Sequence, residues 1–172
     1  LDEVTSGWQR SNLIILAARP AMGKTAFVLS MAQNMIMNRE KPRTVALFSL
    51  EMSRAELVQR ILCSVAQVNQ MDVKKGNLKE EEWIRITRSM NVLAETPLYI
   101  DDTPGLSILQ LRARARRMVA QHGVRAIMID YLQLLSSPGS ARESRQVEVS
   151  SISRGLKALA RELNVPVVCL SQ

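Results

Sequence analysis

Aromatic side chains are scarce in this chain of 172 residues. They make up 3% of the sequence, whereas hydrophobic residues together make up 47%. A core with so few rings must be built mainly from leucine, isoleucine, valine, methionine and alanine, and the nine methionines fit this expectation. The length suffices for one full hydrophobic core, so residues 1–172 are expected to form a single domain.

Cysteine and long apolar runs are scarce as well. Cys63 and Cys169 lie far apart in apolar stretches, and they form neither a C-x-x-C motif nor a zinc-ligand spacing. We therefore expect two reduced core cysteines in a cytoplasmic protein. No signal peptide is recognisable, and no apolar run approaches the ~20 residues that span a membrane, so no membrane association is expected.

Positive charge exceeds negative charge in the sequence. Lysine and arginine number 23 against 16 aspartates and glutamates, which gives a net charge of +7. Such an excess is typical of proteins that bind a polyanion such as nucleic acid, but it also occurs where surface lysines serve only solubility. Arg112, Arg114, Arg116 and Arg117 form a basic face on one predicted helix, where like charges repel each other. A solvated surface, or compensation by DNA or a partner subunit, accounts for this face.

The most specific pattern lies in residues 13–25. Six apolar residues are followed by a turn with Pro20 and Gly23, and apolar residues then recur from Val28 to Ile36 at the spacing of one helix face. This order predicts a buried strand, a tight loop and a helix. A P-loop is built this way: backbone N–H groups face a phosphate, the lysine reaches the β- and γ-phosphates, and the threonine hydroxyl binds Mg²⁺.

The P-loop pattern G-x-x-x-x-G-K-[ST] is matched except at its first position, which is Ala18. Because an alanine at positive φ is strained, the first turn of the loop must use a conformation that L-residues adopt. The alternative interpretation is an ordinary helix start with a lysine at its tip. The residues predicted to surround the phosphates are Ala18, Arg19, Pro20, Ala21, Met22, Gly23, Lys24 and Thr25.

Apolar strands and amphipathic helices alternate along the rest of the chain. Strands are expected at residues 13–18, 44–49, 98–100, 126–129 and 167–172. This alternation predicts an α/β fold with a mostly parallel sheet and helices on both of its faces. In such a sheet the ligand binds at the carboxyl ends of the strands, so residues that directly follow strands are candidates for chemistry.

Three polar residues follow strands in this way. Asp130 after the run 126–129 is the Walker B pattern, and its carboxylate would lie near Thr25 and hold Mg²⁺, unless it only ends the strand. Glu51 either polarises the water that attacks the γ-phosphate or is simply a charge favoured beside a helix N-terminus. Gln172 could contact the γ-phosphate.

Two further segments are open to more than one interpretation. Asp101 and Asp102 also follow a strand, but the adjoining Thr-Pro-Gly favours a role in a turn. A loop rich in serine, proline and glycine, at about 135–145, contains Arg142 and Arg145 but no aromatic residue. Such a loop could bind nucleic-acid phosphates without stacking on bases.

Taken together, these segments resemble the RecA-like ATPase core of the bacterial replicative DNA helicases, the DnaB family. The resemblance covers nearly the whole chain and is most specific in AARPAMGKT (17–25), FSLEM (48–52), IDYLQL (129–134) and LKALAREL (156–163). The family often has alanine at the position of Ala18. A P-loop alone is common to many families, whereas this ordered set is not.

The resemblance implies a role for each matching position. It implies that Lys24 binds the β- and γ-phosphates of ATP, that Thr25 and Asp130 bind Mg²⁺, that Glu51 is the catalytic carboxylate and that Gln172 senses the γ-phosphate. It also implies a P-loop ATP hydrolase that acts as a homohexameric ring and unwinds DNA 5′–3′ along single-stranded DNA. The loop with Arg142 and Arg145 would face the central channel, and primase and a helicase loader would be partners.

Some parts of the family have no counterpart in these 172 residues. They are the N-terminal domain with its linker, and the segment after Gln172 with a second DNA loop and the arginine finger. The chain is therefore expected to be a partial ATPase domain with weak activity alone, since an arginine finger is worth about 10³–10⁵ in rate. The alternatives are a RecA-like recombinase or signalling ATPase that does not unwind DNA, or a nucleotide-binding module without efficient turnover.

Overall fold

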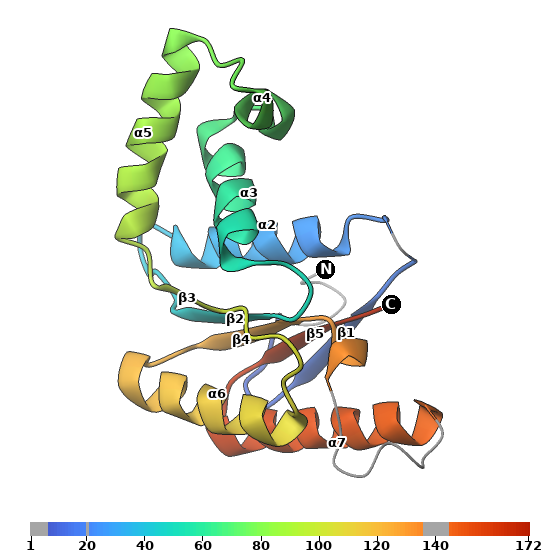
Figure 1. Ribbon diagram of the computed structural model, residues 1–172. Helices are drawn as coiled ribbons and strands as arrows, with labels where there is room; N and C mark the ends of the chain where they lie inside the picture. Colours follow the sequence, from blue (N-terminus) through green and yellow to red (C-terminus); the bar gives the residue numbers. More distant parts are fainter. Residues whose placement is uncertain (1–6, 20, 136–144) are drawn as a thin grey trace.

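The computed structural model describes residues 7–19, 21–135 and 145–172, and within these ranges five strands form one sheet (Figure 1). Every pair of neighbouring strands is parallel, and the strand order is β1-β5-β4-β2-β3. In chain order the strands are β1 (Leu13–Ala17), β2 (Val45–Ser49), β3 (Leu98–Asp101), β4 (Ala126–Asp130) and β5 (Val167–Ser171). The predicted parallel sheet is thus confirmed, and strand β5 lies between β1 and β4.

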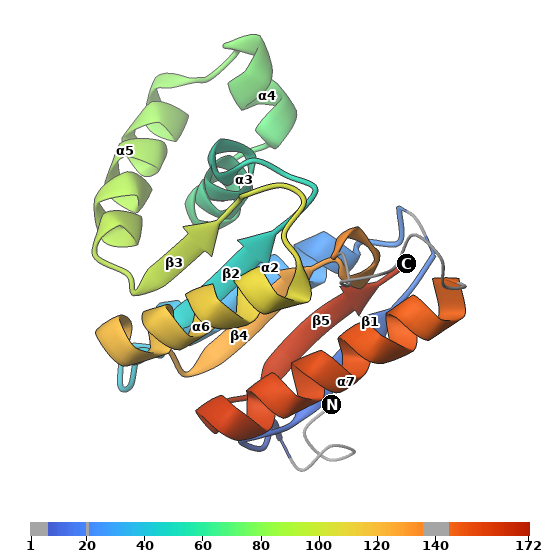
Figure 2. The same ribbon diagram turned by 60° about the horizontal axis from the view of Figure 1, so that its bottom comes forward.

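Helices cover both faces of this sheet, as the sequence predicts (Figures 1 and 2). Helices α2 and α3 lie over one face, and α6 and α7 lie over the other. The described helices are α2 (Lys24–Ile36), α3 (Arg54–Ala66), α4 (Gln70–Lys75), α5 (Glu80–Ala94), α6 (Ile108–His122), the 3₁₀ turn η1 (Leu132–Leu134) and α7 (Arg145–Leu163). None of the helices in the described ranges is long and apolar enough to cross a membrane.

Strand β2 shows how the core is divided between the two faces. All five of its residues are buried, and its side chains alternate between the two sides of the sheet. Val45 and Leu47 join the apolar cluster under α2 and α3, whereas Ala46 and Phe48 join the cluster formed with α6 and α7. The same division buries Cys169 in the second cluster, and both cysteines are free thiols in the core, as expected.

Local signals in the sequence set several helix starts. Ser53 caps α3 and exchanges hydrogen bonds with Glu56, and Ser107 and Gln110 do the same for α6. The segment between α3 and α5 contains the short helix α4. The Asn69 side chain accepts a hydrogen bond from the backbone N–H of Met71 at its start, and Gly76 ends it in the left-handed conformation.

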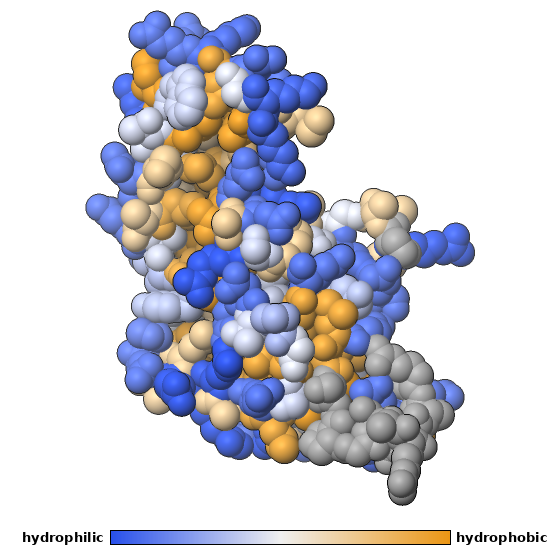
Figure 3. Space-filling model, viewed as in Figure 1, coloured by the Kyte–Doolittle hydropathy of each residue, from blue (hydrophilic) through white to orange (hydrophobic). Residues whose placement is uncertain are grey.

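Helices α3, α4 and α5 project away from the sheet on the side that α2 covers (Figure 1). Helices α3 and α5 pack against each other, and a small apolar cluster of Ala66, Val68 and Ile86 joins them. An open groove lies between α3, α5 and β3, and Val58, Met90 and Leu98 are among its lining residues. Apolar side chains remain visible at the surface over this part of the molecule (Figure 3).

Three of the four arginines on α6 pair with carboxylates within the chain. Arg114 donates two hydrogen bonds to Asp101, at 3.0 and 2.8 Å, and Arg112 and Arg116 both bind Glu162 on α7. The hydrogen bonds from Arg116 and Arg112 lower the pKa of Glu162 to about 2. Arg112, Arg114 and Arg116 therefore join α6 to β3 and α7, and Arg112 and Arg116 share one carboxylate.

Asp101 and Asp102, at the end of β3 and directly after it, have structural roles, in agreement with the expected turn. Burial disfavours the charged form of Asp101, but hydrogen bonds from Arg114 and Thr103 outweigh it and hold the pKa of this carboxyl below its usual value. Asp102 accepts a 2.7 Å hydrogen bond from the backbone N–H of Arg54. Asp102 thereby fixes the start of α3 against the end of β3.

Candidate nucleotide-binding site

The loop between β1 and α2 has the backbone conformation that its sequence predicts. Gly23 lies at the N-cap of α2 with φ 81°, in the left-handed region that favours glycine. Ala18 does not have a positive φ, so its presence at the first position of the pattern causes no strain there. Ala21 adopts φ 61° instead. Among the described residues of the loop, Ala21 is thus the L-residue in the left-handed region, three positions later than the substituted glycine.

The predicted phosphate-binding residues differ in exposure. Arg19, Ala21, Met22 and Gly23 are exposed, which fits a role for their backbone N–H groups rather than their side chains. Ala18, Lys24 and Thr25 are half-buried, and Pro20 lies outside the described residues.

Lys24 links the ends of two neighbouring strands, β1 and β5. Its Nζ donates to the carbonyl of Ala18 after β1, at 3.1 Å, and to the carbonyl of Ser171 at the end of β5, at 3.2 Å. The same Nζ lies 5.8 Å from the centre of the Tyr131 ring. Phosphate oxygens carry charge and accept stronger hydrogen bonds than neutral carbonyls. The amine is therefore held by weak acceptors that a bound phosphate would replace.

The Thr25 hydroxyl and the Asp130 carboxylate meet as expected. Thr25 Oγ1 donates to Asp130 Oδ2 at 2.7 Å, and Asp130 is only 3% exposed at the end of β4. Burial raises the pKa of Asp130, against the hydrogen bond from Thr25 and the positive charges of Lys24 and Arg60. One hydroxyl and one carboxylate suit Mg²⁺, which keeps water and phosphate oxygens as its other ligands.

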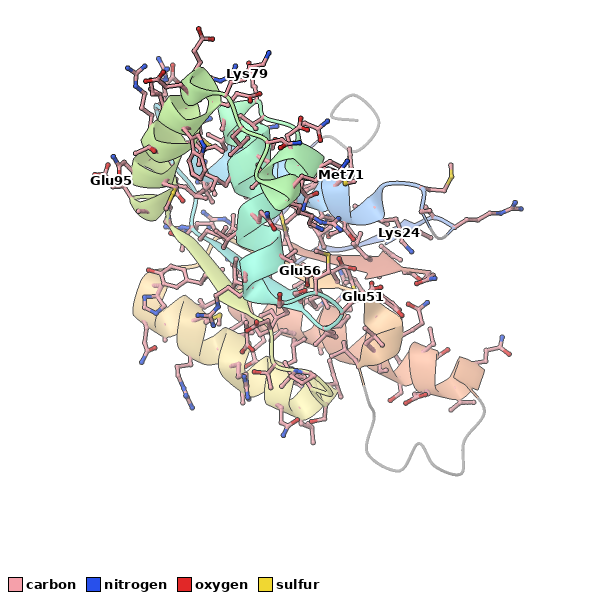
Figure 4. The ribbon with its side chains drawn as sticks, turned by 45° about the horizontal axis from the view of Figure 1, so that its top comes forward. Lys24, Glu51, Glu56, Met71, Lys79 and Glu95 are labelled. Carbon is pink, nitrogen blue, oxygen red and sulfur yellow. The ribbon has the colours of Figure 1, made fainter. Side chains whose placement is uncertain are left out.

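Glu51 follows β2 at the same edge, and its two neighbours in the chain are anchored. The Leu50 N–H donates to the carbonyl of Asp130 at 2.8 Å. The buried Ser49 hydroxyl donates to the carbonyl of Met52 at 2.7 Å and accepts from the Met52 N–H at 3.2 Å. The Glu51 side chain is exposed between them, and Figure 4 shows Glu51 and Lys24 near the same edge. Ser49 stands in an otherwise apolar strand, and this sequence feature could have predicted its hydrogen bonds with Met52.

Gln172 follows β5 and is also exposed at this edge. Its backbone is bound by the side chain of Gln133 in η1, a contact that the sequence patterns did not predict. Arg142 lies outside the described residues. Arg145 is the first residue of α7, but its side chain lies outside the description too, so the predicted DNA contacts of both arginines remain predictions.

This geometry brings together a cation, a metal-binding pair and a carboxylate. Lys24, Thr25, Asp130 and Glu51 come from three separate strand ends and converge where β1, β5, β4 and β2 end. Such an edge can bind a nucleoside triphosphate with Mg²⁺ and activate a water for attack on the terminal phosphate.

Comparison with known proteins agrees with this arrangement. The family model described as DnaB-like helicase C terminal domain matches residues 1–172. The chain is 49% identical over 172 residues to the replicative DNA helicase DnaC of Bacillus subtilis (strain 168) and 51% identical over 172 residues to the replicative DNA helicase DnaB of Geobacillus stearothermophilus. In both cases the match covers 100% of this chain but only 37% of the relative.

Two solved structures have the same fold. One is a separately solved ATPase domain with a TM-score of 0.90 and 38% identity, and the match covers 99% of this chain and 60% of that one. The other is a DnaB-like replicative helicase, studied for its interactions with primase. It has a TM-score of 0.89 and 38% identity, with 98% of this chain and 40% of that one covered. The RecA-like α/β fold expected from the sequence is confirmed. The chain belongs to the DnaB-like helicase C-terminal domain family.

Proposed function

We propose that this chain is the ATP-hydrolysing motor of a replicative DNA helicase, which couples hydrolysis to movement along single-stranded DNA. The observation that carries the proposal is the Thr25–Asp130 hydrogen bond at 2.7 Å beside the Lys24 amine. A metal-binding pair next to a P-loop lysine is suited to phosphoryl transfer from a nucleoside triphosphate. In this proposal residues 1–172 form one partial ATPase domain.

Each residue has a distinct task in the proposed reaction. Backbone N–H groups at the start of α2 and the amine of Lys24 bind the β- and γ-phosphates of ATP. Thr25 and Asp130 would hold Mg²⁺, which would neutralise charge on the phosphate oxygens. Glu51 accepts a hydrogen bond from the attacking water and orients it toward the γ-phosphorus. Gln172 contacts the γ-phosphate and thereby distinguishes ATP from ADP.

The proposed assembly extends beyond this chain. By its resemblance to the DnaB family, we infer a ring-shaped homohexamer that holds single-stranded DNA in a central channel. Arg142 and Arg145 then lie on a segment that contacts the DNA phosphates. The net charge of +7 supports a nucleic-acid partner. Because the chain spans 37% of its curated relatives, contacts with primase and a loader are proposed for the intact protein.

A strand-displacement assay distinguishes a motor from a recombinase or a signalling ATPase. The intact protein should release a labelled strand from a forked duplex when ATP and Mg²⁺ are present. The Lys24→Ala variant, which lacks the phosphate-binding amine, should release no strand. ATP consumption without any strand release by the unaltered protein would reject unwinding and favour the alternative functions.

A further inference from the structure

We propose that Gln133 is a positioning residue that holds Gln172 in the orientation needed to read the γ-phosphate of ATP. This inference rests on the proposed function, in which Gln172 contacts that phosphate. It adds a residue to the site and assigns it a measurable property, the preference of the protein for ATP over ADP.

Gln133 binds both backbone polar groups of Gln172. Its Nε2 donates to the carbonyl of Gln172 at 2.8 Å, and its Oε1 accepts from the N–H of Gln172 at 3.2 Å. Among side chains, only asparagine and glutamine present a donor and an acceptor on one planar amide group. Asparagine is one methylene shorter, so glutamine has the greater reach from η1 to this backbone.

The position of Gln133 explains why such an anchor is useful. The backbone ladder between β4 and β5 extends to Ile129 opposite Cys169. Strand β4 ends at Asp130 and the chain turns into η1, whereas β5 continues to Ser171. The amide of Gln133 therefore makes to Gln172 the kind of paired hydrogen bonds that a neighbouring strand would make.

The same amide reaches the residue that holds the P-loop lysine. Gln133 Nε2 also donates to Ser171 Oγ at 2.8 Å, and the carbonyl of Ser171 accepts from Lys24 Nζ at 3.2 Å. Gln133 thus fixes two consecutive residues, Ser171 beside the phosphate-binding lysine and Gln172 at the exposed edge. An exposed glutamine on an unanchored backbone would sample many orientations, and few of them would meet the phosphate.

The expected consequence is selective for the nucleotide. The γ-phosphate is present in ATP and absent from ADP, so losing this contact weakens ATP binding only. A hydrogen bond to a charged group is worth about one to two orders of magnitude in affinity. Removing the Gln133 amide should therefore lower the ratio of ATP affinity to ADP affinity by about 10-fold to about 100-fold. A general loss of folding would weaken the binding of ATP and of ADP alike, and it would leave the ratio of the two affinities unchanged.

The test compares variants of the intact protein by calorimetric titration with Mg²⁺, using ADP and a non-hydrolysable ATP analogue. Gln133→Ala should lower the analogue-to-ADP affinity ratio and leave ADP affinity unchanged. Gln172→Ala should lower the ratio to the same extent, and the double variant should be no lower than either single one. Gln110→Ala is the matched control, because Gln110 also binds a backbone N–H, that of Ser107 at 2.9 Å, but caps α6 instead. This control should keep the ratio of the unaltered protein.

Each other outcome would overturn the proposal in a recognisable way. If only Gln172→Ala lowers the ratio, Gln133 has no positioning role while Gln172 remains the sensor. If Gln133→Ala lowers the ratio further in the Gln172→Ala background, Gln133 does not act through Gln172. If neither single variant lowers the ratio, Gln172 does not read the γ-phosphate, and that part of the proposed function fails together with the positioning role.

Discussion

Replacing Lys24 by alanine in the intact protein should reduce ATP turnover by about 10²-fold or more. Lys24 is the first residue of α2, and its amine lies between the carbonyls of Ala18 and Ser171. Without it, the charge that develops on the β- and γ-phosphate oxygens lacks its nearest protein cation. The rate of phosphate release in the presence of single-stranded DNA measures this effect. The fold should persist, because the side chain is not part of either apolar cluster.

Lys157→Ala is the matched control for this prediction. Its amine also binds a backbone carbonyl, that of Ser11 at 2.9 Å, but does so near the start of β1, at the opposite end of that strand. Both variants lose a lysine amine that binds backbone carbonyl oxygen, yet only Lys24→Ala should lose turnover. Normal turnover by Lys24→Ala would refute the assignment of this loop as the phosphate site.

Replacing Glu51 by glutamine should slow ATP hydrolysis by about 10²–10⁴-fold, which is the usual contribution of a general base. Nucleotide binding should persist, because glutamine has the same shape and the anchors on either side of Glu51 remain. Those anchors are the hydrogen bond from Leu50 to Asp130 and the pair between Ser49 and Met52. Single-turnover hydrolysis and ATP affinity, measured on the same samples, separate the chemical step from binding.

The neighbouring Glu56 provides the control for Glu51. Its carboxylate accepts a hydrogen bond from the Ser53 N–H in the cap of α3, and hydrogen bonds from Ser53 hold the pKa of Glu56 below its usual value. Figure 4 shows both glutamates near the start of α3, where Glu51 precedes the helix and Glu56 lies in its first turn. Glu56→Gln should keep the rate of hydrolysis. Equal losses of rate in both variants would mean that Glu51 acts through the helix start and not on the water.

Much of this architecture follows from local patterns in the sequence. The apolar strands and amphipathic helices fix the α/β class, and the residues after each strand point to the ligand-binding edge. Thr25 and Asp130 are 105 positions apart, yet their contact was predictable because parallel strands end at one edge of the sheet. The short helix α4 was missed, since six residues are too few to show a helical period.

Other contacts depend on which strands and helices lie side by side, and local patterns do not encode this. Gln133 meets Gln172 only because β5 lies beside β4. Glu162 offsets Arg112 and Arg116 only because α7 lies beside α6. In both cases the partners are tens of residues apart, so neither pairing could be recognised before the fold was known.

The rate of ATP hydrolysis by the intact protein, measured with and without single-stranded DNA, tests the central claim most directly. The claim is that the edge formed by Lys24, Thr25, Asp130 and Glu51 drives movement along DNA. A motor should hydrolyse ATP slowly alone and much faster when single-stranded DNA is added, and Glu51→Gln should abolish the faster rate. Hydrolysis that is indifferent to DNA would contradict the motor and would indicate a signalling ATPase in its place.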